Sequence, residues 1–182
     1  MTTAIASTPV APSPAFNPIT ESRLSVKAVK MLHGIEGSGF RCKVYFDGVF
    51  AGEAQDNADG GPVQLYPVSA DMFANIHGYL GSLPKMPFHG FDLDITLDIA
   101  IVGLVQAASI SKALARAHKK SFCIARSDTR FGSYLHVPCL TSEVDATIAA
   151  FDKEFGTGQW LMLANPRDGV LMPAEYYSAR AA

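Results

Sequence analysis

The chain has 182 residues, a length typical of a single folded domain. Hydrophobic residues make up 48% of the sequence and charged residues only 18%, which excludes general disorder because so many apolar side chains can build a core. The net charge of −2 excludes a uniformly basic protein, but the charges are segregated: residues 23–46 and 99–130 are net positive, and residues 47–98 are net negative. Such blocks create surface fields of opposite sign that steer partners.

Cysteine usage and the N-terminal segment indicate a reducing, cytoplasmic setting. Cys42, Cys123 and Cys139 are an odd number without C-x-x-C spacing, so the sequence predicts neither a disulfide framework nor a zinc site. Residues 1–22 contain four prolines and lack the charged start and apolar stretch of a secretory signal; we expect a disordered or extended arm. The uncharged run at residues 99–111 is shorter than the ~20 residues that span a bilayer, so no membrane association is expected.

The sequence of the first part of the domain predicts an antiparallel sheet. Strands are predicted over residues 23–32, 40–46, 49–55 and 63–66. Asp47-Gly48 suits a type I′ turn because both positions need positive φ. Pairing Phe46 with Val49 then gives one apolar face and one mixed face, as expected for a sheet covered on one side.

The longest predicted helix begins at Asp92 or Asp94 and reaches residue 117. Its carboxylates lie near the N-terminal end and its cations near the C-terminal end, so both complement the helix macrodipole. Residues 99–110 are apolar or small all round, which places this helix in the centre of the core.

Two shorter helices are also predicted. Ser69 caps a helix over residues 70–80, because its hydroxyl can accept an orphan backbone N–H. Ser142 with Asp145 resembles a capping pair that opens a helix over residues 143–155. Further strands are predicted over residues 121–126, 134–140 and 159–164.

The predicted fold is therefore α+β, with a mainly antiparallel sheet packed against one long apolar helix and two shorter helices. We expect one domain over residues 23–165, preceded by the arm at residues 1–22. Residues 166–182 are predicted to form an irregular C-terminal tail.

A resemblance to small proteins carried by phages, prophages and plasmids lies in the order of several glycine-containing segments. These segments are His33-Gly34-x-Glu36-Gly37-x-Gly39-Phe40, Tyr45-x-Asp47-Gly48 and Asp59-Gly60-Gly61-Pro62. The resemblance implies an accessory gene of a mobile genetic element. Such genes often encode inhibitors of host defence, including anti-CRISPR proteins, or modulators of host enzymes, and the resemblance transfers no catalytic residue.

Two loops have compositions that ligand-binding loops share. Asp56 and Asp59 lie in the acidic sequence Asp-Asn-Ala-Asp-Gly-Gly, which lacks the alternating ligands and distal Glu of a calcium loop and favours turn formation. Residues 33–39 are rich in glycine but lack the lysine and following helix of a phosphate loop, so they are predicted to be a connection between strands. Both loops remain possible contact surfaces.

A basic patch is the strongest candidate for a binding site. It comprises Lys112, Arg116, Lys119, Lys120, Arg126, Arg130 and Phe131. Lysine and arginine there can contact phosphates, and an Arg–aromatic pair is typical of an interface hot spot. The alternative is that these cations complement the helix dipole in a solvated helix end.

No catalytic residue, metal site or cofactor is predicted. The five histidines, His33, His77, His89, His118 and His136, show no metal-ligand spacing. The leading hypothesis is a non-enzymatic binding protein, acting in the cytoplasm of a bacterial host, that inhibits or modulates a host protein or defence complex. Partner contacts are predicted through the basic patch and through Asp56 and Asp59. Two alternatives stay open: a nucleic-acid-binding module using residues 112–130, and an enzyme with a site assembled across the fold.

Overall fold

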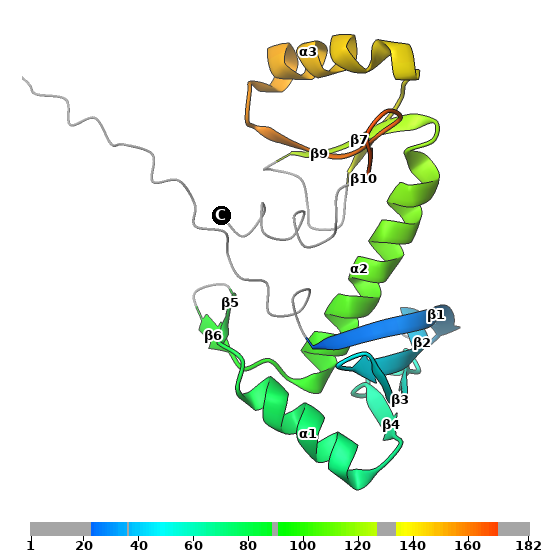
Figure 1. Cartoon of the computed structure of the whole chain (residues 1–182), viewed down its shortest axis with the longest axis vertical. Coiled ribbons are helices and arrows are strands. Elements are labelled where there is room, and N and C mark those ends of the chain that lie inside the picture. The colour runs from blue at the N-terminus through cyan, green and yellow to red at the C-terminus, as the bar shows by residue number, and fades with distance from the viewer. Residues whose placement is uncertain (1–22, 36, 89–90, 127–133, 171–182) are drawn as a thin grey trace, which may run out of the picture.

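The computed structural model describes residues 23–35, 37–88, 91–126 and 134–170. These residues form two four-stranded antiparallel sheets near opposite ends of one long helix, α2 (Leu97–Ala117) (Figure 1). Helix α1 (Ala70–Gly81) packs against the first sheet, and α3 (Val144–Phe155) lies across one face of the second (Figure 1). The predicted α+β class, with antiparallel strands, one long helix and two shorter helices, is confirmed.

The first sheet consists of consecutive antiparallel strands in the order β1-β2-β3-β4. Their bounds are Leu24–Gly34, Gly37–Phe46, Val49–Asp56 and Gln64–Pro67. The hairpin between β2 and β3 turns at Asp47 and Gly48, whose φ angles of 50° and 78° are both positive, as a type I′ turn requires. Phe46 pairs with Val49 across this turn, which confirms the predicted register.

The inner face of this sheet packs against α1 and the N-terminal half of α2. Cys42 and Val44 of β2 are buried there, together with Ala54 of β3. They share one core with Ile76 of α1 and Ile101 of α2, which are both 0% exposed. The alternation of buried and exposed residues along β2 is that of a strand covered on one side.

The glycine-rich stretch at residues 33–39 is not a simple connection, because β1 continues to Gly34 and β2 begins at Gly37. Gly34 and Gly39 have a packing role. A Cβ on Gly39 would lie 2.1 Å from the carbonyl oxygen of Asp56, and one on Gly34 would lie 2.5 Å from that of Asn57. The absence of side chains at these two positions lets the loop after β3 close over the hairpin.

Replacing Gly39 with alanine is expected to lower the free energy of unfolding by about 1–3 kcal/mol, because backbone must move to admit the methyl group. Gly78 is a matched control in α1, where an added Cβ meets nothing within 4 Å. Gly78→Ala is expected to raise stability by up to ~1 kcal/mol. Urea unfolding measures both changes, and equal stabilities for the two variants would contradict the packing role of Gly39.

Helix α2 begins later than the sequence predicts. Asp92 belongs to β6 (Phe91–Leu93), which pairs with β5 (Met86–Phe88). Thr96 is the actual N-cap, and its hydroxyl accepts the N–H of Ile99 at 3.3 Å. Asp98, in the first turn, accepts the backbone N–H of Val63 at 2.6 Å and so joins the helix to the segment before β4.

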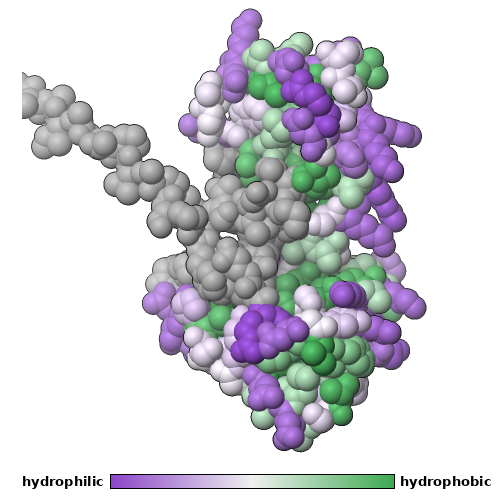
Figure 2. Space-filling model, in the orientation of Figure 1, coloured by the Kyte–Doolittle hydropathy of each residue, from purple (hydrophilic) through white to green (hydrophobic). Residues whose placement is uncertain are grey.

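The buried residues of α2 lie mostly between Ala100 and Ala107, and Leu114 is the one buried residue of its second half. The helix is therefore not the fully enclosed core helix that its composition predicts. Ile101 and Val105 pack beneath the first sheet, and Leu114 packs against the second. Residues 108–113 are half-buried or exposed. By length and composition α2 is the one helix in the described ranges that could cross a bilayer: its most apolar window has mean hydropathy 1.5 and is 28% buried. Side chains on both ends serve as core residues, and Figure 2 shows hydrophilic groups projecting beside its second half.

The second sheet has the strand order β10-β9-β7-β8. In that order the bounds are Gly169–Val170, Trp160–Asn165, Ser121–Arg126 and Leu135–Pro138. The central strand, β7, is buried on both faces. Cys123 and Ala125 face the cluster with Leu114 of α2, whereas Phe122 and Ile124 face the cluster on α3.

Helix α3 also starts differently from the prediction. A single 3₁₀ turn, Thr141–Glu143, precedes it, and Glu143 rather than Ser142 satisfies a backbone group: its Oε2 accepts the N–H of Leu140 at 3.3 Å. Asp145 does not cap the helix but pairs with Arg167, whose Nη2 lies 2.9 Å from Oδ1.

The predicted irregular tail begins with ordered structure. The side-chain oxygen of Asn165 accepts the backbone N–H groups of Arg167 and Asp168, which makes a turn, and β10 then pairs with β9. The rest of the tail, residues 171–182, and the predicted arm at residues 1–22 lie outside the described residues.

Candidate functional site

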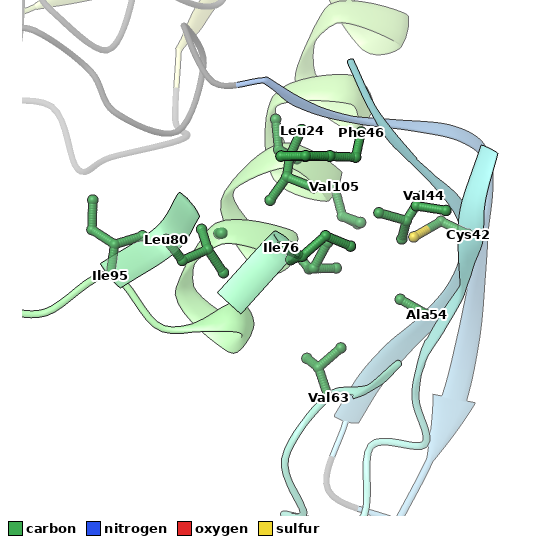
Figure 3. Close-up of a cluster of buried hydrophobic side chains, with 14 of the residues drawn as sticks. Leu24, Cys42, Val44, Phe46, Ala54, Val63, Ile76, Leu80, Ile95 and Val105 are labelled. Atoms are coloured by element: carbon green, nitrogen blue, oxygen red, sulfur yellow. The ribbon is translucent and has the colours of Figure 1, made fainter. Parts of the chain in front are cut away.

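The outer face of the first sheet is the side turned away from α1 and α2. Figure 3 shows Cys42, Val44 and Ala54 pointing into the core towards Ile76, so the residues that alternate with them point outward. The outward residues include the following ten: Lys27, Lys30, Arg41, Lys43, Tyr45, Phe50, Glu53, Gln55, Gln64 and Tyr66. We call this set the outer face.

Four cations lie together on β1 and β2 of the outer face. Lys27 pairs directly with Lys43 across the two strands, and Lys30 pairs with Arg41. All four side chains are exposed. Like charges placed opposite each other on neighbouring strands repel and do not stabilise the sheet. This arrangement produces a positive surface.

Glu53 is the single carboxylate of the outer face. Its Oε2 accepts a hydrogen bond from Nε of Arg41 at 3.0 Å and contacts Nη2 of the same guanidinium. Hydrogen bonding from Arg41 lowers the pKa of Glu53, and the charges of Arg41, Lys43 and Lys30 lower it further. The three lysines make no ion pair with any carboxylate in the described ranges, so the face keeps a positive excess at neutral pH.

The pKa of the Glu53 carboxyl is expected to lie below the ordinary value of about 4.3 and to rise towards it in an Arg41→Gln variant. Because the folded-state pKa is depressed, the stabilisation by this pair is present above the unfolded pKa and is lost as pH falls through the folded one. Carboxyl NMR titration measures the pKa. Lys153→Gln on α3 is a control that should leave it unchanged, and an unaltered pKa in Arg41→Gln would contradict the assignment.

Three aromatic side chains share the outer face with these cations. The rings of Tyr45 and Phe50 meet edge to face, with centroids 5.7 Å apart. Nζ of Lys27 lies 4.6 Å from the centroid of Tyr45, and Nζ of Lys43 lies 5.9 Å from that of Phe50. Tyr66 is 56% exposed and Phe50 is 39% exposed. These two rings line the same open hollow of about 500 Å³.

The acidic loop after β3 uses both of its predicted site carboxylates to turn the chain. Oδ1 of Asp56 accepts the N–H of Ala58 at 2.8 Å, and Oδ1 of Asp59 accepts the N–H of Gly61 at 3.2 Å. These are Asx turns, which explain the choice of aspartate at both positions. A contact between Asp56 or Asp59 and a partner stays a prediction.

The basic patch predicted from the sequence is brought together only in part. Lys112, Arg116, Lys119 and Lys120 are exposed at the C-terminal end of α2 and in the turn that follows it. Arg126 ends β7, where its backbone pairs with Trp160, and its side chain is outside the described atoms. Arg130 and Phe131 lie outside the described residues. The sequence of α2 and of the turn that follows it, residues 97–120, contains no phenylalanine, tyrosine or tryptophan.

The described residues include side chains of the metal-ligating and nucleophilic types. No group of three or more histidine, cysteine, aspartate or glutamate side chains there is placed to hold a metal ion. Burial raises the pKa of the Cys42 and Cys123 thiols to about 11, so both stay protonated at neutral pH and are poor nucleophiles. The hollow beside Phe50 and Tyr66 contains Arg41 and Glu53, which are already paired with each other.

Comparison of the chain with family models, curated proteins and solved structures finds no match. The segments that carry the resemblance to phage and plasmid proteins fall in the first sheet: the β1–β2 hairpin, the turn before β3 and the acidic loop after it. The resemblance itself stays a prediction.

Sequence reasoning missed the outer face as a site, although it predicted a mixed face opposite the apolar one. The available signal was the alternation of Arg41, Lys43 and Tyr45 along one strand, which places all three on the same side. The contribution of Lys27 and Lys30 was harder to see. A bulge in β1 between these two residues shifts the register and returns Lys30 to the outer face.

Proposed function

We propose that this protein is a non-enzymatic binding protein that recognises an anionic macromolecule through the outer face of its first sheet. One observation carries the proposal: four exposed cations and three aromatic rings lie on one sheet face, with a single carboxylate among them. Cations draw an anionic partner to the surface and set the encounter rate, and aromatic and arginine side chains supply contact energy.

The proposed biological role follows from the resemblance of the sequence to small proteins carried by phages, prophages and plasmids. The protein would be an accessory product of a mobile genetic element that binds a host macromolecule or complex in the bacterial cytoplasm and modulates it. The outer face supports the binding step of this role, because an uncompensated positive surface favours an anionic partner.

A second candidate surface is the basic end of α2, with Lys112, Arg116, Lys119 and Lys120. The exposure of all four side chains favours this surface as a binding site. Its position at a helix C-terminus gives those charges a structural role as well, because cations there complement the helix macrodipole. The outer face also carries the exposed rings of Phe50 and Tyr66 beside its cations, and we therefore place it first.

Capture from a bacterial lysate, with and without nuclease, tests the proposal. The comparison uses three proteins: the wild-type chain, a Lys27→Glu/Lys43→Glu variant of the outer face, and a Lys112→Glu/Lys119→Glu variant of α2. We expect wild type and the α2 variant to retain one salt-eluted anionic partner and the outer-face variant to lose it. Loss in the α2 variant alone would transfer the function to the second candidate surface, and the absence of any salt-dependent partner would refute the proposal.

A further inference from the structure

We propose that the partner of the outer face is a single-stranded nucleic acid, whose bases stack on Phe50 and Tyr66 while its phosphates contact the cations of β1 and β2. This inference rests on the proposed function and names the partner class. It starts from two exposed aromatic rings that lie beside the cations of the outer face. Phe50 and Tyr66 are 39% and 56% exposed and line one open hollow on neighbouring strands.

The rings provide what unpaired bases need. A base in a single strand has a free π-face, and stacking on an aromatic side chain tolerates any sequence. Phe50 and Tyr66 lie on β3 and β4, and the hollow between them is open to solvent, so a base can reach either ring. Tyr45 meets Phe50 edge to face from β2, which fixes the orientation of the Phe50 ring.

The cations provide a track for the backbone beside these rings. Lys27, Lys30, Arg41 and Lys43 form two cross-strand pairs on β1 and β2, so the positive charge runs along one side of the aromatic row. Arg41 also lines the hollow that contains the rings, where it is paired with Glu53, so the positive excess comes from the three lysines. A basic groove next to stacking rings is the general arrangement of proteins that bind single strands.

The same geometry disfavours a duplex as the partner. A duplex keeps its base faces inside the stack, so a sheet with exposed rings gains nothing from Phe50 or Tyr66. An acidic protein can also contact exposed rings, through its apolar side chains. A comparison with an anionic polymer that has no bases therefore separates single-stranded nucleic acid from other anionic partners.

Fluorescence anisotropy with a labelled short oligothymidylate at ~50 mM salt tests the inference. A Phe50→Leu/Tyr66→Leu variant keeps apolar bulk but removes both rings, and we expect it to weaken binding at least about tenfold. Val49→Ala is a matched control, because Val49 is 59% exposed on the same strand but is not part of the outer face. We expect it to bind as wild type does, and we expect the duplex of the same length to bind more weakly than the single strand.

Polyglutamate, an anionic polymer without bases, separates failure of this inference from failure of the proposed function. The inference is overturned if the wild type binds polyglutamate and the oligonucleotide with equal affinity, or if the Phe50→Leu/Tyr66→Leu variant binds the oligonucleotide as tightly as the wild type does. Either result still agrees with the proposed binding of anionic macromolecules. Absence of binding to both polymers overturns both. Ultraviolet cross-linking of the wild type to a bromouridine-containing oligonucleotide needs no variant. Adducts on Phe50 or Tyr66 support the inference, and adducts confined to α2 overturn it.

Discussion

Replacing Phe122 with alanine is expected to lower the free energy of unfolding by about 3–5 kcal/mol, the range for a large aromatic residue removed from a packed core. Phe122 is 0% exposed in the middle of β7. Its ring lies 5.3 Å from that of Phe151 on α3 and 6.2 Å from that of Trp160 on β9, measured between centroids. Removing it leaves a cavity at the junction of the sheet and the helix.

Urea unfolding followed by the fluorescence of Trp160 measures this change, because the only tryptophan of the chain contacts the same cluster. Leu140→Ala is the matched control in the neighbouring connection, since Leu140 is 65% exposed. We expect that change to stay within about 0.5 kcal/mol. A loss of less than about 1 kcal/mol in Phe122→Ala would show that α3 does not pack on β7 as described.

Replacing Lys27 and Lys43 together with glutamine is expected to weaken binding of oligothymidylate about fiftyfold at ~50 mM salt. Each phosphate contact on a single strand contributes ~0.7 to the slope of log K against log salt, so two lost contacts lower the slope by about 1.4. The two lysines pair across β1 and β2, and neither makes an ion pair with a described carboxylate. Their removal is therefore expected to leave stability almost unchanged.

The control for this prediction is a second pair of neutralised lysines away from both basic surfaces, Lys85→Gln/Lys153→Gln. It changes the net charge of the chain by the same amount, and affinity should stay within about twofold of wild type if local contacts dominate. An equal loss in both variants would mean that only the overall charge matters. Such a result would contradict a defined contact surface on the outer face.

Local sequence signals predicted the parts of the fold that depend on neighbouring residues. The Asp47-Gly48 turn fixed the β2–β3 register, because positive φ at two successive positions leaves few other turns. Ser69 was correctly identified as the cap of α1, and its hydroxyl accepts the N–H of Met72 at 3.1 Å. The predicted bounds of β7 also match the structure, since its run of apolar residues is typical of a strand buried on both faces.

The errors in the predicted fold arose where distant segments decide the structure. Asp92 and Asp94 resembled helix starts, but pairing of β5 with β6 holds Asp92 in a strand, and Thr96 takes the cap. Gly39 resembled part of a loose connection, whereas its role depends on the backbone of Asp56, on the next strand. Neither the pairing nor the close approach can be read from a local pattern.

The candidate site, like the fold, was predictable from local sequence patterns only where its residues are close together along the chain. The sequence singled out cations that are close together along the chain, from Lys112 to Lys120, and these share the end of one helix. It did not connect Lys27 with Lys43, which become neighbours only when β1 pairs with β2. Tyr66 joins them through two further strand pairings, so the outer face exists only at the level of the sheet.

The most direct test of the central claim, that the outer face is the binding surface, is an NMR titration of the isotope-labelled full chain with oligothymidylate at low salt. We predict that the largest backbone shifts fall on outer-face residues of β1 to β4, among them Lys43, Phe50 and Tyr66. Residues 112–120 of α2 and the following turn should shift little. Shifts confined to residues 112–120, or a spectrum unchanged at saturating oligonucleotide, would contradict the claim.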